Sequence, residues 1–218
     1  MNILIVGSGA RESAFIWKLS QSRKNINIFS INPNADAQEL STPIYTQKED
    51  LKFIKSKVID LKIDMVLVGP EIPLINGIQD YLKKDPLTKK TAVIGPSKKG
   101  AKLEGSKDFA KNFMQKYNIP TAKYRSFSQV QIQEGLDYLE TIKPPYVLKA
   151  DGPASGKGVL IIDNIIEAKT QLEEMLLGKF GESSKTVVVE EFLDGIEMSC
   201  FVLFDGKNYK VLPYAKDY

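Results

Sequence analysis

Two lysines stand on either side of a glycine-rich segment, in a pattern suited to holding the phosphates of a nucleotide. Lys149 is followed by Ala-Asp-Gly-Pro-Ala-Ser-Gly, and Lys157 then precedes Gly158. Glycines such as Gly152 and Gly156 let the backbone approach an anion closely, while the lysines supply positive charge. Apolar runs before and after the segment predict two strands. We therefore expect a flexible loop between two strands that closes over phosphates.

Two other interpretations of this loop have to be weighed. A Walker A loop needs four residues between its first glycine and the Gly-Lys pair, and then Ser or Thr at the start of a helix. Here three residues separate Gly152 from Gly156, and a glycine and a β-branched run follow the lysine. That excludes a Walker A loop. An ordinary hairpin with solvated lysines is the other alternative. Lys149 argues against it, because a charge that continues an apolar strand is costly without a partner.

The composition narrows the class of protein. The chain has 218 residues, of which 43% are hydrophobic and 26% charged, as is typical of a soluble globular protein with more than one domain. The formal charge of +3 is spread along the chain, so no nucleic-acid surface is indicated. The apolar run at residues 3–6 is too short for a signal peptide or a membrane span. We expect a cytoplasmic protein without nucleic-acid or membrane partners.

Cysteine and histidine usage limits the chemistry. The single Cys200 excludes an internal disulfide and suits a reducing compartment, and its apolar surroundings predict a buried structural thiol. The chain contains no histidine, which excludes Ser-His-Asp and Cys-His catalysis and histidine-ligated metal sites within it. Any chemistry must therefore use carboxylates, lysines, arginines, backbone amides and bound cations.

Strands and helices alternate in the first third of the chain. This alternation predicts an open parallel sheet with crossover helices, ending near residue 96. The expected strands are residues 2–6, 26–31, 65–68 and 91–94, and the expected helices are residues 10–20, 48–61 and 73–82.

The rest of the chain has a different pattern. Ser97 and Ser106 are expected to cap two successive helices that Gly105 separates. From residue 124 we expect an α+β unit with a helix at 128–141, the loop-bearing hairpin, a helix at 165–177 and a strand at 186–191. Strand-like residues 199–204 and 209–212 have little chain after them, which suggests a fragment. One face of the helix at 165–177 should form core against the hairpin; it carries Ile165, Ala168, Leu172, Met175 and Leu176.

A glycine turn follows the first strand. Gly7-Ser-Gly9 begins like a dinucleotide fingerprint, but Glu12 stands where the third glycine belongs, and no acidic residue ends the second strand. Nicotinamide binding is therefore not expected. A glycine turn at a helix N-terminus suits a phosphate monoester, and Arg11 could assist. A tight turn with no ligand is the alternative.

Three further groups have a functional and a plain interpretation each. Glu71 lies after the third strand, where open sheets place ligands, and could accept hydrogen bonds from an amine or simply favour a helix N-terminus. Lys107 lies in the first turn of its helix, where a cation opposes the dipole, so either an anionic ligand or solvent faces it. Glu190 and Glu191 end an apolar strand, so one should face inward. With Glu197 they suit adenine and ribose, and a charged turn is the alternative.

Together these pieces resemble the phosphoribosylamine–glycine ligase (glycinamide ribonucleotide synthetase) family of the ATP-grasp superfamily. Five motifs in order carry the resemblance, which extends through the whole chain and matches roughly the N-terminal half of that enzyme. They are Gly-Ser-Gly-Ala-Arg-Glu from Gly7, Gly-Pro-Glu-Ile-Pro-Leu from Gly69, Leu-Glu-Gly-Ser-Lys from Leu103, the loop from Lys149 to Gly158, and Glu-Glu-Phe-Leu-Asp-Gly from Glu190.

The resemblance implies an α/β fold and a reaction. The fold would be an open parallel-sheet pre-ATP-grasp domain (1–96), the start of the ATP-grasp core (97–123), an α+β small lobe with the lid (124–192), and a truncated return to the core (193–218). ATP would phosphorylate glycine, and 5-phosphoribosylamine would attack the acyl phosphate to give glycinamide ribonucleotide, ADP and phosphate. The Mg²⁺ ligands of the family would lie beyond Tyr218, so this piece would be an incomplete catalyst. A monomer is the expected state.

The resemblance also assigns roles to residues. Lys149 and Lys157 would be catalytic and would bind ATP phosphates with Lys107, Gly152, Gly156 and Gly158. Glu190, Glu191, Leu193 (through its backbone) and Glu197 would bind adenine and ribose. The substrate side would comprise Gly7, Gly9, Arg11, Glu71, Pro73 and Leu74.

Some residues depart from the family pattern. Ser13 and Tyr218 stand where histidine is usual, and Pro153 and Ser155 replace Leu and Ala. Two alternatives to the main function are another ATP-grasp carboxylate–amine ligase and a nucleotide-binding module without catalysis. The Gly-Pro-Glu motif and the first glycine turn favour the named family.

Overall fold

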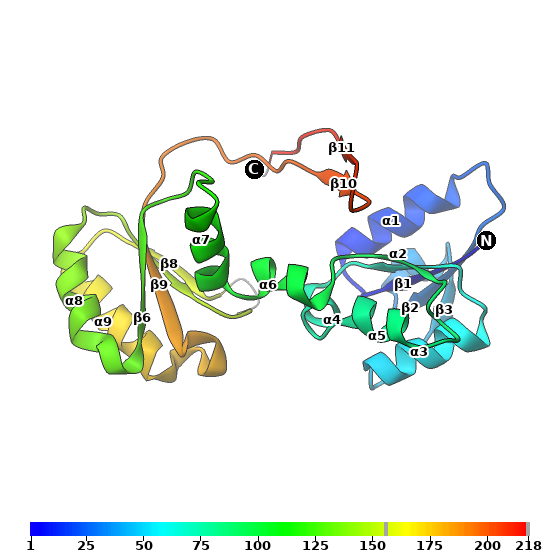
Figure 1. Ribbon diagram of the computed structural model, residues 1–218, viewed down its shortest axis with the longest axis horizontal. Coiled ribbons are helices and arrows are strands. Elements are labelled where there is room, and N and C mark those ends of the chain that lie inside the picture. Colours follow the sequence, from blue (N-terminus) through cyan, green and yellow to red (C-terminus); the bar gives the residue numbers. More distant parts are fainter. Residues whose placement is uncertain (155–156, 217–218) are drawn as a thin grey trace.

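The computed structural model describes residues 1–154 and 157–216. It contains an N-terminal α/β lobe and a second, α+β lobe, with helix α6 (Lys98–Gly105) between them (Figure 1). Helix α7 (Lys107–Lys116) follows α6 directly and lies against the second lobe. The predicted fold class, an open parallel sheet followed by an α+β unit, is confirmed.

The first lobe is built on a sheet of five parallel strands in the order β3-β2-β1-β4-β5. Such a sheet is buried on both faces, and the short apolar runs of the sequence meet that need. The strands are β1 (Asn2–Val6), β2 (Asn27–Ile31), β3 (Thr42–Ile44), β4 (Met65–Val68) and β5 (Ala92–Ile94).

Alternate residues of β1 supply the two cores of this lobe. Ile3 and Ile5 pack with Ile16 of helix α1 (Ala10–Ser20), whereas Leu4 and Val6 face the opposite layer. This division follows from the two-residue period of a strand. The opposite layer consists of helices α3 (Leu51–Asp60) and α5 (Ile78–Lys84).

One prediction for this lobe was wrong in detail, and two elements were missed. The helix expected at 73–82 is two helices, α4 (Glu71–Ile75) and α5, because Gly77 adopts φ +88° and ends the first one. The short helix α2 (Ala35–Gln38) and strand β3 were not foreseen. Strand β3 has three residues, includes Pro43 and lies at the sheet edge, where proline is tolerated and an apolar run is not needed.

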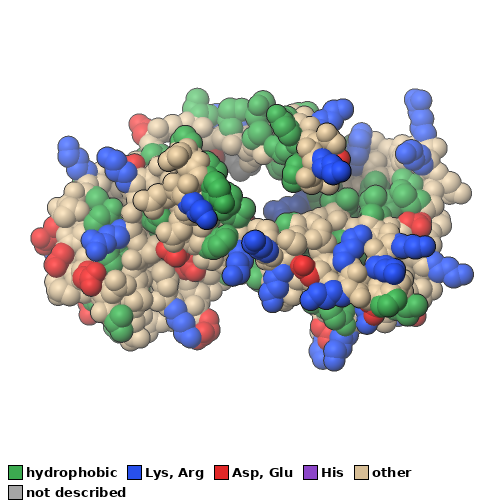
Figure 2. All heavy atoms as spheres, viewed as in Figure 1, with side chains coloured by type: hydrophobic (Ala, Val, Ile, Leu, Met, Phe, Trp, Pro, Cys, Tyr) green, Lys and Arg blue, Asp and Glu red, His purple; other side chains and the backbone are tan. Residues whose placement is uncertain are grey.

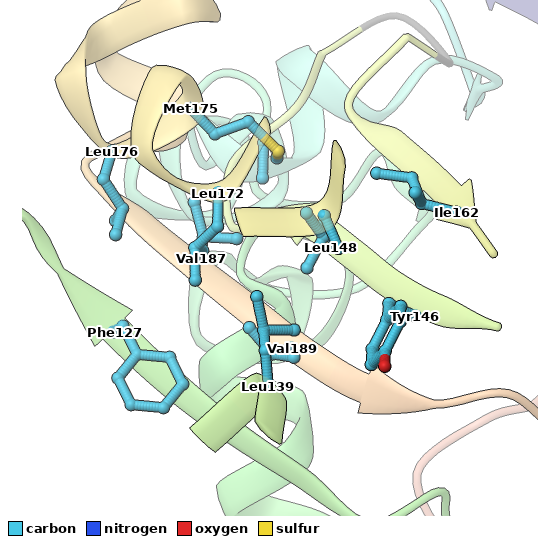
Figure 3. Packing of buried hydrophobic residues seen from close by; sticks show 12 residues of the cluster. Phe127, Leu139, Tyr146, Leu148, Ile162, Leu172, Met175, Leu176, Val187 and Val189 are labelled. Carbon is cyan, nitrogen blue, oxygen red and sulfur yellow. The ribbon is translucent and has the colours of Figure 1, made fainter. Parts of the chain in front are cut away.

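The second lobe has an antiparallel sheet in the order β6-β9-β7-β8. One face packs against helices α8 (Ile132–Thr141) and α9 (Ile165–Glu174), and a π-helical turn (Met175–Lys179) extends α9. Figure 3 shows Leu148 and Val189 of the sheet pointing toward Leu172 of α9. The strands are β6 (Tyr124–Ser128), β7 (Tyr146–Ala150), β8 (Val159–Ile162) and β9 (Thr186–Glu191).

The sequence pattern predicted most of this lobe. The glycine-rich segment does join two antiparallel strands, β7 and β8, and the predicted helical face is in the core, with Ile165 at its margin. Strand β6 was missed, and the helix expected from 128 starts at Ile132 after a 3-10 turn. Strand β6 is an edge strand with one fully buried side chain, Phe127, so its sequence lacks clear alternation.

After β9 the chain leaves the second lobe and forms a small hairpin. Its strands are β10 (Val202–Phe204) and β11 (Tyr209–Val211), which pair antiparallel. Figure 2 shows hydrophobic side chains gathered along this segment, and every residue of both strands is exposed. Cys200 is exposed too. The predicted buried thiol was therefore wrong, because the apolar residues around Cys200 do not form a core in the part of the chain that the structure describes.

The helices of the described residues are short. None of them is long and apolar enough to cross a membrane.

Candidate nucleotide and substrate sites

A cleft of about 610 Å³ lies where helix α7 faces strands β7 and β9. Its volume is within the range of small-molecule sites. One wall is apolar, with Met114, Val147 and Ile161 among its residues. The polar rim brings together six residues that the sequence predicted for one ligand, namely Lys107, Lys149, Glu190, Glu191, Leu193 and Glu197.

Strand alternation aims two of these side chains into the cleft. Leu148 and Val189 point to the core of the second lobe, so Lys149 and Glu190, their neighbours, point to the opposite face, toward α7. Glu190 is buried, at 4% exposure, which confirms that one of the two consecutive glutamates faces inward. The neighbouring Glu191 is partly exposed, and its Oε1 accepts the Lys123 N–H at 2.9 Å.

Glu190 is paired with two lysines at once. Its Oε2 lies 3.1 Å from Lys149 Nζ and 2.9 Å from Nζ of Lys111 on helix α7. Lys149 keeps 28% of its side chain exposed, whereas Lys111 keeps 8%. A buried carboxylate needs such charge compensation, and here the described structure supplies it from two elements.

The base of the glycine-rich loop is tied to the start of α7. Lys107 Nζ donates to Ala150 O at 2.8 Å, and the Lys107 N–H donates to Asp151 O at 3.3 Å. Asp151 Oδ1 in turn accepts the Ser106 hydroxyl at 3.0 Å and the Asp108 N–H at 2.8 Å. A carboxylate at a helix N-terminus is favoured by the dipole. Lys107, expected to face phosphates, thus also anchors the loop through backbone carbonyls.

We expect Asp151→Ala to lower the free energy of unfolding by about 1–2 kcal/mol, since two hydrogen bonds at a helix N-terminus are lost. Urea unfolding of the chain measures this change. Asp163→Ala, which truncates an exposed aspartate just after β8, is the matched control and should stay within about 0.5 kcal/mol of wild type. Equal stability of the two variants would contradict an anchoring role for Asp151.

The loop itself is only partly described. The Gly152 N–H donates to Ser183 O at 3.0 Å, in the 3-10 turn Gly181–Ser184, whereas Gly158 O accepts the Ala150 N–H at 2.7 Å and continues the pairing of β7 with β8. A Cβ on Gly158 would lie 2.6 Å from Ala154 Cβ, which leaves no room for a side chain. Lys157 is exposed and its N–H donates to Ala154 O. The predicted Gly156 and the divergent Ser155 lie outside the described residues.

Burial and charge affect one lysine of the cleft. Burial lowers the pKa of Lys107 below the usual 10.5, and the charge of nearby Lys149 lowers it further, while Asp151 opposes the shift. A lysine that loses its proton more readily is typical of a site where cations are gathered for an anion.

The predicted substrate residues meet at the other lobe, at the carboxyl ends of β1 and β4. Arg11 donates to Gly69 O at 2.7 Å and lies 3.4 Å from Glu71 Oε1. A Cβ on Gly7 would lie 2.7 Å from Pro70 Cδ, so the first glycine turn and the Gly-Pro-Glu turn are in contact. Gly9 precedes α1, and its N–H donates to Glu12 Oε2 at 2.6 Å.

The two remaining residues predicted for the substrate side, Pro73 and Leu74, lie in different places. Pro73 lines a second pocket of about 490 Å³, together with Glu49 and Ile72. Burial raises the pKa of Glu49, and the charge of Glu12 adds to that rise. Leu74 instead packs against the core of the first lobe, so the structure separates its side chain from Arg11 and Glu71.

Comparison with known proteins gives the family. Residues 1–104 match the family model of the phosphoribosylglycinamide synthetase N domain, and residues 105–218 match that of the phosphoribosylglycinamide synthetase ATP-grasp (A) domain. The chain belongs to the phosphoribosylglycinamide synthetase family.

Relatives of the chain are found in bacteria. The phosphoribosylamine–glycine ligases of Caldanaerobacter subterraneus subsp. tengcongensis and Fusobacterium nucleatum are each 42% identical over 100% of the chain, which covers 51% and 50% of their lengths. The solved phosphoribosylamine–glycine ligase of Thermotoga maritima superposes with a TM-score of 0.79 at 30% identity, over 100% of this chain and 50% of that one. The chain therefore spans about half the length of the curated relatives it matches.

A more distant likeness concerns the fold alone. The N5-carboxyaminoimidazole synthase of Aspergillus clavatus, solved with ADP and 5-aminoimidazole ribonucleotide, has a TM-score of 0.72 at 14% identity, over 99% of this chain and 53% of that one.

Three residues of the candidate sites were missed in the sequence. Lys111 sits on a helix rich in polar residues and resembles a solvated lysine until Glu190 is placed beside it. Asp151 has no signal beyond its position before Gly152. Glu12 was noted only as a departure from a fingerprint, although a Glu three residues after a helix N-cap can accept the N–H of the N-cap residue, as Glu12 Oε2 does from Gly9 here.

Residues 1–154 and 157–216 contain no group of three or more Cys, Asp or Glu side chains placed to hold a metal ion. The described residues do not fit a magnesium site of that kind, so no step below is assigned to a metal.

Proposed function

We propose that the intact protein joins glycine to 5-phosphoribosylamine, using ATP, and releases glycinamide ribonucleotide, ADP and phosphate. One observation carries the proposal: in a chain of the synthetase family, one cleft brings two loop-proximal lysines and three glutamates of the predicted ATP site onto an apolar wall. The second lobe would hold ATP, and the first would hold phosphoribosylamine and glycine.

The cleft offers a different contact to each part of ATP. Its apolar wall suits the adenine ring, while the backbone at Leu193 and the exposed carboxylate of Glu197, which also line the cleft, would supply hydrogen bonds to adenine and ribose. Lys107 and Lys149 would neutralise the phosphates, and the loop that ends at Lys157 would cover them. A nucleotide thus fits the residues present.

The chemistry we propose needs positioning and charge neutralisation. A glycine carboxylate oxygen attacks the γ-phosphorus of ATP, the bond to the β–γ bridging oxygen breaks, and ADP leaves. The amine nitrogen of phosphoribosylamine then attacks the carbonyl carbon of glycyl phosphate, phosphate leaves, and the nitrogen loses a proton. Negative charge moves in both steps, so fixed lysines lower the barrier without a protein nucleophile. None of these steps requires a histidine.

The first lobe offers contacts of the right type for the second substrate. The glycine turn from Gly7 to Gly9 at the N-terminus of α1 suits a phosphate group, with Arg11 beside it. Glu71 lies 3.4 Å from Arg11 and could accept hydrogen bonds from an amine. This pair is about half exposed, so it is worth little to stability and is free to exchange partners.

The proposal also includes a division of the chain into domains, a magnesium site, an oligomeric state and a location. We place residues 1–96 in the substrate domain, 97–123 in the start of the ATP-grasp core, 124–192 in the small lobe and 193–218 in the return to the core. Magnesium would be held by residues beyond Tyr218. A monomer in the cytoplasm is the proposed state and location.

The test is ADP release by the intact protein with glycine and phosphoribosylamine supplied together. Release should require both substrates, and omission of either should abolish it. Release with a different carboxylic acid would favour another ATP-grasp ligase. ATP binding with no turnover under any of these conditions would contradict the ligase and favour a nucleotide-binding module.

The lowered pKa of Lys107 predicts a pH dependence of nucleotide binding. A neutral Lys107 must take up a proton to hold phosphate, so the affinity for ADP should fall as the pH rises above this lowered pKa, at a pH below that expected for an ordinary lysine of pKa 10.5. Arginine stays charged, so Lys107→Arg should flatten the profile. Titration calorimetry between about pH 7 and 10 measures both profiles. Parallel profiles for wild type and Lys107→Arg would contradict a phosphate contact from Lys107.

A further inference from the structure

The nucleotide cleft contains one lysine that the proposed function does not use. Lys111 lies on α7 with 8% of its side chain exposed, 2.9 Å from Glu190 Oε2. Its Nζ also donates to Thr121 Oγ1 at 2.8 Å and lies 3.4 Å from Ala122 O. An ammonium group has three protons, and these three partners use all of them. Lys111 is therefore held on all three protons in a nearly buried position, whereas Lys107, two of whose carbonyl contacts are at 3.5 Å, can still turn toward a phosphate.

Lys149 is placed differently on the same carboxylate oxygen. Its Nζ lies 3.1 Å from Glu190 Oε2, and within residues 1–154 and 157–216 this is its one hydrogen-bond partner. With 28% of its side chain exposed to the cleft and two protons uncommitted, Lys149 can turn toward a ligand. The two lysines thus differ in freedom, although they share one partner.

Lys149 can turn toward a ligand only if Glu190, the partner that both lysines share, stays paired with a cation. Glu190 keeps 5% of its side chain exposed, and a buried carboxylate left without a cation is strongly disfavoured. With Lys111 in place, Lys149 can leave while Glu190 stays paired. Without Lys111, every phosphate contact of Lys149 would leave Glu190 unpaired, so the nucleotide would compete with Glu190 for Lys149.

We propose that Lys111 is a positioning residue, which holds Glu190 paired and in place so that Lys149 is released to bind nucleotide phosphate. The proposal rests on the proposed ATP site and adds to it a residue that keeps Lys149 available for phosphate. It predicts that Lys111 affects the phosphates of the nucleotide, through Lys149, and leaves adenosine binding alone.

The test compares ADP with adenosine on the full chain. Lys111→Met should weaken ADP binding about tenfold in calorimetry and leave the affinity for adenosine within about twofold, because adenosine has no phosphate for Lys149. In a Lys149→Met background the same change should have no further effect on ADP. Lys116→Met, on the exposed side of the same helix, should bind both ligands as wild type does.

A second variant keeps the test decisive if the unpaired Glu190 prevents folding. Lys111→Met combined with Glu190→Gln removes both charges of the buried pair, and it should match Glu190→Gln alone in its ratio of ADP to adenosine affinity. A tenfold lower ratio would overturn the proposal, because Lys111 would then act on the phosphates directly.

Other results separate this proposal from the proposed function. Equal losses of ADP and adenosine affinity in Lys111→Met would indicate a merely structural lysine and overturn the proposal. Wild-type ADP affinity in a folded Lys111→Met chain would overturn it too, with the ATP site intact. A wild-type chain that binds no ADP would overturn both the nucleotide site and the role of Lys111.

Discussion

Lys149→Ala in the intact protein should reduce ATP-dependent turnover by about 100-fold or more. Lys149 extends from β7 into the cleft and is the lysine whose donors are free for the phosphates. Removing one fixed donor from a site where charge develops costs about 10²–10³ in rate in well-studied enzymes. The loss should appear in kcat as well as in kcat/KM, since the charge on the transferred phosphoryl group is greatest during its transfer. Steady-state ADP release with saturating glycine and phosphoribosylamine measures both constants.

The fold should tolerate this change, which makes the loss of turnover interpretable. Glu190 keeps its pair with Lys111 when Lys149 is truncated, so the buried carboxylate is not left alone. Lys169→Ala is the matched control, because Lys169 pairs with Glu140 on the far, helical face of the same lobe and is mostly a surface contact. It should retain turnover within about twofold. Near-normal turnover in Lys149→Ala would contradict the assignment of the glycine-rich loop and Lys149 to the ATP site.

The glycine-rich loop shows how much the sequence could predict of the site. Its lysines, glycines and flanking apolar runs are adjacent in the chain, so their chemistry and their strand–loop–strand setting could be inferred together, and the structure confirms that setting. That one of Glu190 and Glu191 faces inward was predicted on the same basis, because strand alternation is a local rule, and the structure shows that it is Glu190.

Contacts between distant elements were out of reach for the same reasoning. Lys111 lies on a helix whose sequence is polar on most sides, and nothing local distinguishes it from the exposed Lys116. Its pairing with Glu190 depends on how α7 packs against β9. The edge strands β3 and β6 were missed for a related reason, since an edge strand is stabilised by its neighbour and needs little apolar pattern of its own.

The glycines of the first lobe also make contacts that local sequence reasoning could not predict. The fingerprint-like turn was interpreted as a phosphate site because of its backbone freedom, whereas the structure adds a second requirement for glycine there. The Glu12 side chain, 5% exposed, lies against both Gly7 and Gly69, so these glycines provide room for a buried carboxylate that caps α1.

Gly7→Ala should therefore be a strongly disruptive substitution in this lobe. Gly7 has φ +111°, a conformation that side-chain-bearing residues rarely adopt, and an added Cβ would lie 2.7 Å from Pro70 Cδ and 3.0 Å from Glu12 Cδ. The proline ring cannot rotate away, and Glu12 can move only by giving up the Gly9 N–H. Backbone strain and overpacking of this kind cost about 1–3 kcal/mol each, so we expect the free energy of unfolding to fall by about 3 kcal/mol.

The same change should separate the two substrates of the proposed reaction. Gly7 and Pro70 belong to the turns that carry Arg11 and Glu71, so the intact Gly7→Ala protein should lose most of its turnover at ordinary phosphoribosylamine concentrations while its ADP affinity stays within about twofold. Gly195→Ala adds the same methyl group where no atom lies within 4 Å and the backbone is not strained, and its stability should match wild type. A Gly7→Ala protein that is as stable as Gly195→Ala would show that the contact between the two turns is not rigid. Every residue that lines the proposed nucleotide cleft lies outside the sheet of the first lobe. Parallel losses of ADP affinity and turnover would therefore show that the change in the first lobe also unfolds the second lobe.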